Sequence, residues 1–310
     1  PGVPGEDHRG PAGAGIGGIR LKKTLILSFS LKNAYRVNSI LYSLKQIPLV
    51  KKLLPQALYG VKWLKVLANV LSIIWEVSTV FLGKCLYLLL MAFLPCLLYG
   101  GLPKEGVFLH ILLFLTVIGG FANTTLFNPT KDKYYAIVLM RMDAREYTLV
   151  GYGYSILKAI IGFLPFTLLF GLFSGVPLWL CALLPFSIAG YKISYVAYTL
   201  WDYERRGNVY NENKLDRFQW LAIALLLGAA YGLPAFGLVL PTGISMALAL
   251  FSIPIGTVCI PRIYGFREYR ELCRTLLAET MFQMDASARN AQALKTANEK
   301  KISADVSITS

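Results

Sequence analysis

Residues 77–127 read VSTVFLGKCLYLLLMAFLPCLLYGGLPKEGVFLHILLFLTVIGGFANTTLF, and this stretch decides the fold. Two apolar runs, Val77–Tyr99 and Val107–Phe127, are separated by the turn-forming residues YGGLP at 99–103. Each run has the length of about 20 residues that an α-helix needs to cross the hydrocarbon core of a bilayer. The stretch therefore predicts two transmembrane helices joined by a tight turn.

Four more apolar runs follow, and polar segments of very different lengths separate them. Pro-containing turns alternate with the longer charged segments 128–147 and 201–217. The chain is 55% hydrophobic and 15% charged, with a mean hydropathy of +0.54. Because one soluble core rarely hides so much apolar surface, the sequence predicts an all-α polytopic membrane protein with six transmembrane helices. The four further spans are expected at Thr148–Phe173, Leu178–Leu200, Phe218–Leu240 and Gly243–Ile260.

The first span is preceded by a basic amphipathic segment, Leu31–Tyr59. Its apolar residues recur at helical spacing and its Lys and Arg take the other side, which favours a helix lying on an anionic membrane surface. A soluble helix packed on a partner remains an alternative. An interfacial entry is expected before Val77, because Glu76 falls early in the long apolar run. The predicted parts are 1–24, disordered or vector-derived; 25–65, an amphipathic helical region at the cytoplasmic face; 66–262, the six-span domain; and 263–310, a cytoplasmic tail that is helical over about Phe266–Met284 and then disordered.

Lys and Arg are distributed unequally between the two sets of loops. The chain has 31 Lys and Arg against 17 Asp and Glu, a net charge of +14. Basic residues gather before the first span, in segments 128–147 and 201–217 and after the last span, whereas the opposite loops hold only Lys104. This bias predicts a multi-pass protein of the cytoplasmic (inner) membrane with both termini in the cytoplasm. Because the basic residues flank apolar runs, we expect membrane lipid as a partner and no nucleic acid.

Groups able to catalyse reactions are scarce. The chain has two histidines, His8 and His110, and it lacks the HExxH, GxSxG and Walker A patterns. Its five cysteines are scattered without CxxC spacing. The sequence therefore predicts no enzyme, no catalytic residue and no metal site in this chain.

Two groups of polar residues inside the spans are candidates for lining a pathway. Lys158 lies near the middle of the third span, where a charge is costly and often functional. It is expected either to face an aqueous cavity or a partner half, or to form a structural salt bridge. In the fourth span, Tyr191, Tyr195 and Tyr198 form one stripe with Lys192 beside it. That stripe predicts either a polar pathway or an interfacial aromatic belt with ordinary helix packing.

The first long polar segment predicts a short amphipathic helix over Lys131–Tyr147. Tyr135, Val138, Leu139 and Met142 recur at helical spacing, with Lys131, Asp132 and Arg145 among them. Such a helix can insert its apolar face into a cleft on a partner in the cytoplasm. A connector lying on the membrane surface is the alternative.

This order of elements resembles the permease family of ABC-type exporters over about Leu31–Leu276. The run LKNAYRVNSILYSLKQIPLVKKLLP, Leu31–Pro55, is similar to the opening of bacterial ABC permeases. The resemblance implies that the loop helix couples to a separate ABC ATPase subunit. ATP and magnesium would then be bound by that partner, with no cofactor on this chain. It also implies a second six-span half, as a homodimer, a heterodimer or a fused chain.

The expected function is therefore the permease subunit of an ATP-driven exporter for a peptide or lipid-like cargo. The residues leave open the cargo, the direction of transport and whether the chain is a whole subunit or half of a longer one. One alternative is an ion-coupled secondary transporter or channel, which requires acidic residues inside the spans; Glu76 is the available one. A membrane scaffold without transport is the other.

Overall fold

The computed structural model describes residues 62–124, 126, 128–210 and 215–278, with isolated positions on either side. The predicted segment 1–24 apart from Thr24, most of the predicted amphipathic region 25–65 and the end of the tail lie outside the described residues. Every regular element in the described part is a helix, and six of these helices are long and apolar enough to cross a membrane. The predicted fold class, an all-α polytopic membrane protein, is confirmed.

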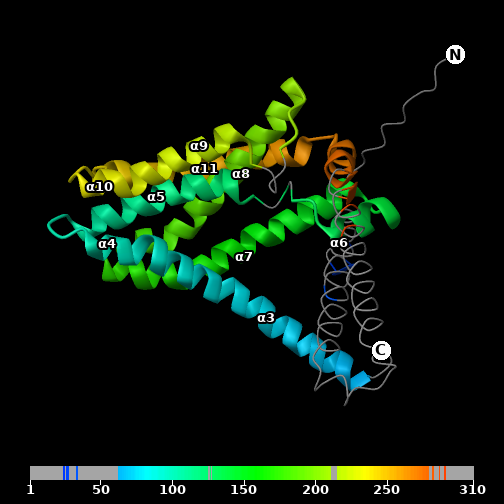
Figure 1. The fold of residues 1–310 in the computed structure, drawn as a ribbon, viewed down its shortest axis with the longest axis horizontal. Helices are drawn as coiled ribbons and strands as arrows, with labels where there is room; N and C mark the ends of the chain where they lie inside the picture. Colours follow the sequence, from blue (N-terminus) through cyan, green and yellow to red (C-terminus); the bar gives the residue numbers. More distant parts are fainter. Residues whose placement is uncertain are drawn as a thin grey trace, which may run out of the picture.

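The helices follow one another with short connections (Figure 1). The predicted entry region before Val77 is part of one continuous helix, since α3 already begins at Lys62 and the candidate span at Asn69. Short π-helical segments, labelled η, interrupt the α-helical structure at three places. A further helix covers residues 269–278. In chain order the elements are α3 (Lys62–Leu88), η2 (Leu89–Phe93), α4 (Leu94–Leu98), α5 (Lys104–Ala122), α6 (Lys131–Tyr134), η3 (Tyr135–Leu139), α7 (Ala144–Phe173), α8 (Leu178–Arg206), α9 (Arg217–Leu227), η4 (Gly228–Gly232), α10 (Leu233–Ala235) and α11 (Thr242–Gly265).

Local sequence explains where several helices begin and end. The Asp143 side chain accepts a hydrogen bond of 2.9 Å from the backbone N–H of Glu146 and so caps the start of α7. Asp216 and Gln219 form a reciprocal capping box at the start of α9. Gly207 ends α8 in the left-handed conformation, with φ of 70°, which glycine adopts without steric cost.

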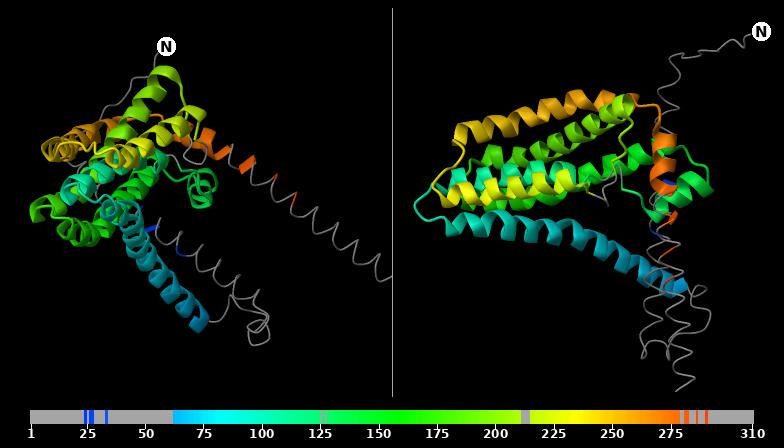
Figure 2. Two further views of the ribbon diagram at one scale, coloured as in Figure 1. Left: turned by 60° about the vertical axis from the view of Figure 1, so that its left-hand side comes forward. Right: turned by 45° about the horizontal axis from the view of Figure 1, so that its top comes forward.

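The long helices lie side by side with α8 in the middle (Figures 1 and 2). α8 packs against α11, α7 and α5, whereas α3 contacts chiefly α7 among the other spans. The most apolar stretches of α5 and α8 are each 56% buried, against 17–28% in the four remaining spans. The α6 end of the bundle, where α6 and helix 269–278 lie, is opposite the end that carries α4 and α10. From the place where they pack together, α3 and α7 diverge toward the α6 end.

α8 and α11 touch backbone to backbone. A Cβ added at Gly190 would lie 2.3 Å from the carbonyl oxygen of Ser252, and one at Gly256 would lie 2.6 Å from the Cα of Gly190. The Ser252 hydroxyl donates to the Ser187 hydroxyl at 2.9 Å beside this contact. Small residues at a helix crossing let backbones approach closely, which is a main source of packing energy between helices in lipid.

Tyrosine and histidine side chains form hydrogen bonds with backbone carbonyls of the π-helical segments η2 and η4. The Tyr231 hydroxyl, in η4, donates to the carbonyl of Met91 in η2 at 2.7 Å. The Tyr99 hydroxyl donates to the carbonyl of Tyr231, also at 2.7 Å. The imidazole of His110 bridges the Ala229 carbonyl, through Nε2 at 3.1 Å, and the Leu240 N–H, through Nδ1 at 3.2 Å. Because a π-helical turn disturbs the regular hydrogen-bond ladder, such side-chain donors keep its carbonyls satisfied in an apolar setting.

Candidate functional site

A pocket of about 210 Å³ lies between α3, α7, α8 and the segment after α5. Three lysines from three helices line it, Lys84, Lys158 and Lys192, and no carboxylate is among the described residues that line it. We call it the three-lysine pocket. Lysines gathered in one pocket between apolar helices repel one another, so their partners decide what the site can do. The remaining lining residues are Thr79, Val80, Asn123, Thr124, Tyr152, Ser155, Ile156 and Ala159.

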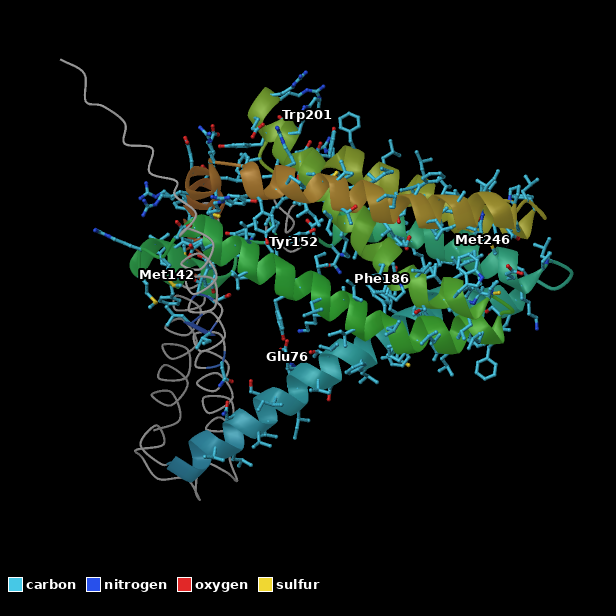
Figure 3. The ribbon with its side chains drawn as sticks, turned by 180° about the vertical axis from the view of Figure 1, so that it is seen from behind. Glu76, Met142, Tyr152, Phe186, Trp201 and Met246 are labelled. Atoms are coloured by element: carbon cyan, nitrogen blue, oxygen red, sulfur yellow. The ribbon has the colours of Figure 1, made fainter. Side chains whose placement is uncertain are left out.

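Glu76 of α3 forms an ion pair with Lys158 of α7, which lines this pocket. The two side chains are 19% and 29% exposed, respectively. The Tyr154 hydroxyl donates to the same carboxylate oxygen at 3.1 Å. Figure 3 shows Glu76 on the side of α3 that faces α7, with Tyr152 above it on α7. Lys158 thus has a salt bridge to another helix and also lines a pocket, and its role in an aqueous cavity or toward a partner half stays a prediction.

Lys192 of α8 reaches across to the end of α5. Its ammonium group donates to the Gly119 carbonyl at 3.1 Å and to the Asn123 carbonyl. The last carbonyls of a helix have no partner within the helix, and a cation beside them also interacts favourably with the helix dipole. This contact fixes the position of one ammonium group on the pocket wall.

Lys84 of α3 lies over an aromatic ring. Its Nζ is 4.7 Å from the centre of the Phe163 ring, and within the described part of the chain no carboxylate oxygen lies within 4 Å of it. Gly162 allows this arrangement, because a Cβ there would lie 2.8 Å from the Val80 carbonyl oxygen and 3.2 Å from Cγ of Lys84.

The three tyrosines predicted with Lys192 do not line this pocket. The Tyr195 ring packs against Phe121 at 6.0 Å and against Tyr198 at 6.3 Å between ring centroids. Tyr198 continues the row to Trp201, at 6.0 Å. The backbone carbonyl of Tyr191 lies near Gly120. The rings thus pack in a row along α8, and the pathway and the aromatic belt both stay predictions.

The loop between α5 and α7 contains α6 and η3 in place of one regular amphipathic helix. Tyr135, Val138 and Leu139 are exposed, together with Met140, whereas Met142 is half-buried. Because the π-helical turn changes the angular spacing of side chains, Ala136 and Ile137 become the buried face. We call Tyr135, Val138, Leu139 and Met140 the loop patch.

The polar residues predicted in this loop hold it to the bundle. The Tyr147 hydroxyl donates to the Asp132 carboxylate at 3.1 Å, and Arg145 donates to the carbonyl of Tyr264 in α11. Lys133, which the prediction did not select, donates to the Leu126 carbonyl at 3.1 Å. The side chain of Lys131 lies outside the described residues.

The loop patch stands on a buried core that joins η3 to four other helices. This α6-end core contains Ala136 and Ile137 from η3 and side chains from α7, α8, α11 and helix 269–278. Burial raises the pKa of the Tyr269 hydroxyl and of the Cys273 thiol, so both stay protonated. The members of the core from outside η3 are Leu126, Ala144, Tyr147, Tyr152, Val196, Ala197, Leu200, Ile263, Phe266, Tyr269, Leu272, Cys273, Leu276 and Leu277.

The sequence predictions selected Lys158 and Lys192 but not Lys84, Asn123 or Ser155. A lysine inside an apolar run was the available signal for Lys84. Among the described residues, no group of three His, Cys, Asp or Glu side chains is arranged to hold a metal ion. Comparisons of the chain with protein-family models, curated proteins and solved structures find no match.

Proposed function

We propose that this chain is the membrane-spanning permease subunit of an ATP-driven exporter whose ATPase is a separate protein. The loop patch is the surface on which that ATPase docks. A second six-span half, as another copy or a related chain, completes the transport pathway. The observation that carries the proposal is the loop patch, an exposed apolar surface built on a buried core that reaches three membrane spans.

The contacts of the loop suit it to transmit force. Ile137 is 3% exposed and lies in one core with Tyr147, Leu200 and Ile263, which belong to α7, α8 and α11. Packed cores move as units because they resist compression. A displacement of the loop patch by a partner therefore moves the ends of α7, α8 and α11 together.

The charge distribution supports a cytoplasmic position for this surface, in the compartment that contains ATP. Lys and Arg concentrate in the segments around the loop and around residues 201–217, as expected of cytoplasmic loops. Both termini are then cytoplasmic, and the protein belongs to the inner membrane. ATP and magnesium bind to the partner ATPase in this scheme.

Affinity purification from native membranes in mild detergent tests the proposal. An ABC ATPase should co-purify with the wild-type chain and be lost from the variant Tyr135→Asp/Val138→Asp/Leu139→Asp. The matched control is Val209→Asp in the second polar segment, because Val138 and Val209 are 38% and 39% exposed. The control variant should retain the ATPase.

Two outcomes argue against the exporter. In one, no ATPase is recovered under several mild conditions. In the other, the ATPase is recovered equally well with the triple variant and with Val209→Asp. Circular dichroism and elution volume must show that the triple variant keeps the fold, which is expected because its three side chains are exposed.

Ion-coupled transport is the second candidate, and the Glu76–Lys158 pair favours it. A half-buried carboxylate between two spans, bonded to an ammonium group and a tyrosine hydroxyl, is a typical proton- or cation-responsive arrangement. In proteoliposomes without any ATPase, this candidate predicts substrate uptake driven by a proton or sodium gradient and abolished by Glu76→Gln. The exporter predicts no gradient-driven uptake.

A further inference from the structure

Arg141 directly follows the loop patch and has a backbone conformation that residues with a side chain rarely adopt. Its φ is 53°, in the left-handed region. The Met142 N–H donates at 2.9 Å to the carbonyl of Ala136, six residues earlier, and this bond closes the turn that ends η3. A return bond of this kind usually follows a left-handed glycine. The end of η3 is therefore a position that glycine fits best.

Elsewhere in the described residues, the positions with positive φ are all occupied by glycine. They are Gly101, Gly175, Gly207 and Gly237, with φ between 70° and 90°. A side chain at positive φ brings Cβ close to the following carbonyl oxygen, and glycine avoids this steric cost. A side chain that is kept at such a position despite the cost is a candidate for a functional role.

The Arg141 side chain is exposed, and the fold does not use its charge. No carboxylate oxygen in the described part of the chain lies within 4 Å of its guanidinium group. Acidic residues of the same loop, in contrast, hold the loop in place. Asp143 caps α7, and the Tyr147 hydroxyl donates to Asp132 at 3.1 Å. The guanidinium group is thus available to a partner outside the described residues.

The position of the loop favours a protein partner over lipid. In Figures 1 and 2, the loop with α6 extends past helix 269–278 at the α6 end of the bundle. The loop patch and Arg141 therefore lie beyond the ends of the spans that pack around α8. Exposed apolar side chains with an arginine beside them are typical of the centres of protein–protein interfaces, in which arginine is enriched.

We propose that the ATPase surface that receives the loop patch is an apolar cleft with a carboxylate at its edge, and that this carboxylate binds the guanidinium group of Arg141. The inference rests on the proposed function, because it names the chemistry of the partner at the loop patch. A guanidinium and a carboxylate group can pair through two parallel hydrogen bonds, which adds geometric specificity. The apolar side chains then supply contact area, and Arg141 sets the orientation of the ATPase.

The experiment measures binding and stability on the same variants. The full chain is placed in phosphatidylcholine nanodiscs, and the probe is the ATPase that co-purifies with the wild-type chain. Arg141→Gly should raise the Kd for this ATPase roughly ten- to hundredfold, the factor expected for a hydrogen bond to a charged group. It should also raise the unfolding midpoint by about 1–3 °C, because glycine removes the steric cost. A merely structural role for Arg141 does not make the chain more stable and its binding weaker.

Three further variants separate the charge of Arg141 from the flexibility of the turn. Arg141→Asn also removes the charge, but asparagine tolerates positive φ, so it should weaken binding as much as Arg141→Gly does. Arg141→Lys keeps the charge without the planar fork and should lose less affinity. Arg267→Gly is the matched control, because Arg267 is exposed between α11 and helix 269–278 and is not among the residues with positive φ. This control should keep the wild-type Kd and should not raise the midpoint.

The Arg141 contact and the exporter can be told apart when they fail. If Arg141→Gly binds the ATPase as tightly as wild type, while the triple variant of the loop patch loses it, the exporter stands and the Arg141 contact is wrong. An equal loss of affinity in Arg267→Gly assigns the effect to general positive charge and also overturns the contact. If no ATPase is recovered with the wild-type chain, the exporter and the contact are both wrong.

A lipid phosphate is the remaining partner that the experiment can detect. Its readout is the unfolding midpoint in nanodiscs of phosphatidylglycerol compared with phosphatidylcholine, because a ligand of the folded state raises the midpoint. The proposal expects the same difference between the two lipids for wild type and for Arg141→Gly. If phosphatidylglycerol stabilises wild type more than Arg141→Gly, the guanidinium group binds lipid and the proposal is overturned.

Discussion

Replacing Gly190 by alanine should destabilise the bundle, although the same change stabilises most helices. The added Cβ would lie 2.3 Å from the Ser252 carbonyl oxygen and 2.7 Å from its carbon. Both are backbone atoms of α11 and have no rotamer by which to move away. α8 and α11 must therefore separate or slide.

The size of the effect follows from three contributions. Exchanging glycine for alanine inside a helix stabilises it by about 1 kcal/mol. Overpacking a tight contact costs about 1–3 kcal/mol. Separation of the helices also weakens the 2.9 Å hydrogen bond between Ser252 and Ser187, worth about 1 kcal/mol. We expect a net loss of about 1–3 kcal/mol, which lowers the unfolding midpoint by roughly 3–10 °C.

The cysteines of the chain provide the assay. Cys96, Cys181 and Cys273 are buried and become reactive toward a thiol-specific fluorophore when the protein unfolds in detergent. Gly151→Ala in α7 is the matched control, because nothing lies within 4 Å of the added Cβ. Its midpoint should stay the same or rise slightly. If Gly190→Ala is as stable as Gly151→Ala, the backbone contact does not hold the two helices together.

Three further predictions concern single groups. Tyr231→Phe removes the donor to the Met91 carbonyl and should cost about 1–3 kcal/mol, measured as a lower midpoint in the thiol assay. Asp143→Ala removes the cap of α7 and should cost about 0.5–2 kcal/mol in the same assay. The folded state binds the thiol proton of Cys273 more tightly than the unfolded chain, because burial raises the pKa above 9.0. This contribution to stability is therefore complete below about pH 9 and is lost as pH rises further, which unfolding followed by tryptophan fluorescence measures.

Each of these predictions has a control variant. Tyr198→Phe, at a half-exposed ring, should leave the midpoint unchanged, and an equal loss would mean that the Met91 carbonyl is not decisive. Asp143→Asn should keep the cap and most of the stability. Cys273→Ala should flatten the decline above pH 9, and Cys85→Ala is the control at a partly buried cysteine of α3. A decline of the same steepness in both cysteine variants excludes Cys273 as its source.

The fold class could be predicted because the pattern that determines it is local. Span length, flanking charges and the turns at Gly101 and Gly175 are all visible within short windows. The start of α3 could not be located in this way. Glu76 suggested an interface, but its charge is offset by Lys158, which lies 82 residues away in the chain.

The candidate site depends on contacts between distant helices, which the spacing of residues along the sequence does not predict. Lys84, Lys158 and Lys192 come from three helices and meet because Gly162 lets α3 approach α7. In the loop, the regular spacing predicted that Met142 shares the exposed face. The π-helical turn at Tyr135–Leu139 instead leaves Met142 half-buried. Such a turn depends on tertiary packing, which helical periodicity does not include.

The contact between Gly190 and Gly256 also bears on the order of assembly during synthesis. The hydroxyls of Ser187 and Ser252 that meet beside it are 65 residues apart, so α8 leaves the ribosome well before α11. Until α11 is inserted, the surface of α8 at Gly190 faces lipid or another helix. Insertion of α11 covers this surface of α8. The chain then continues into helix 269–278, which completes the α6-end core. α11, the last of the six candidate spans in the described residues, is thus the helix that completes the packing around α8.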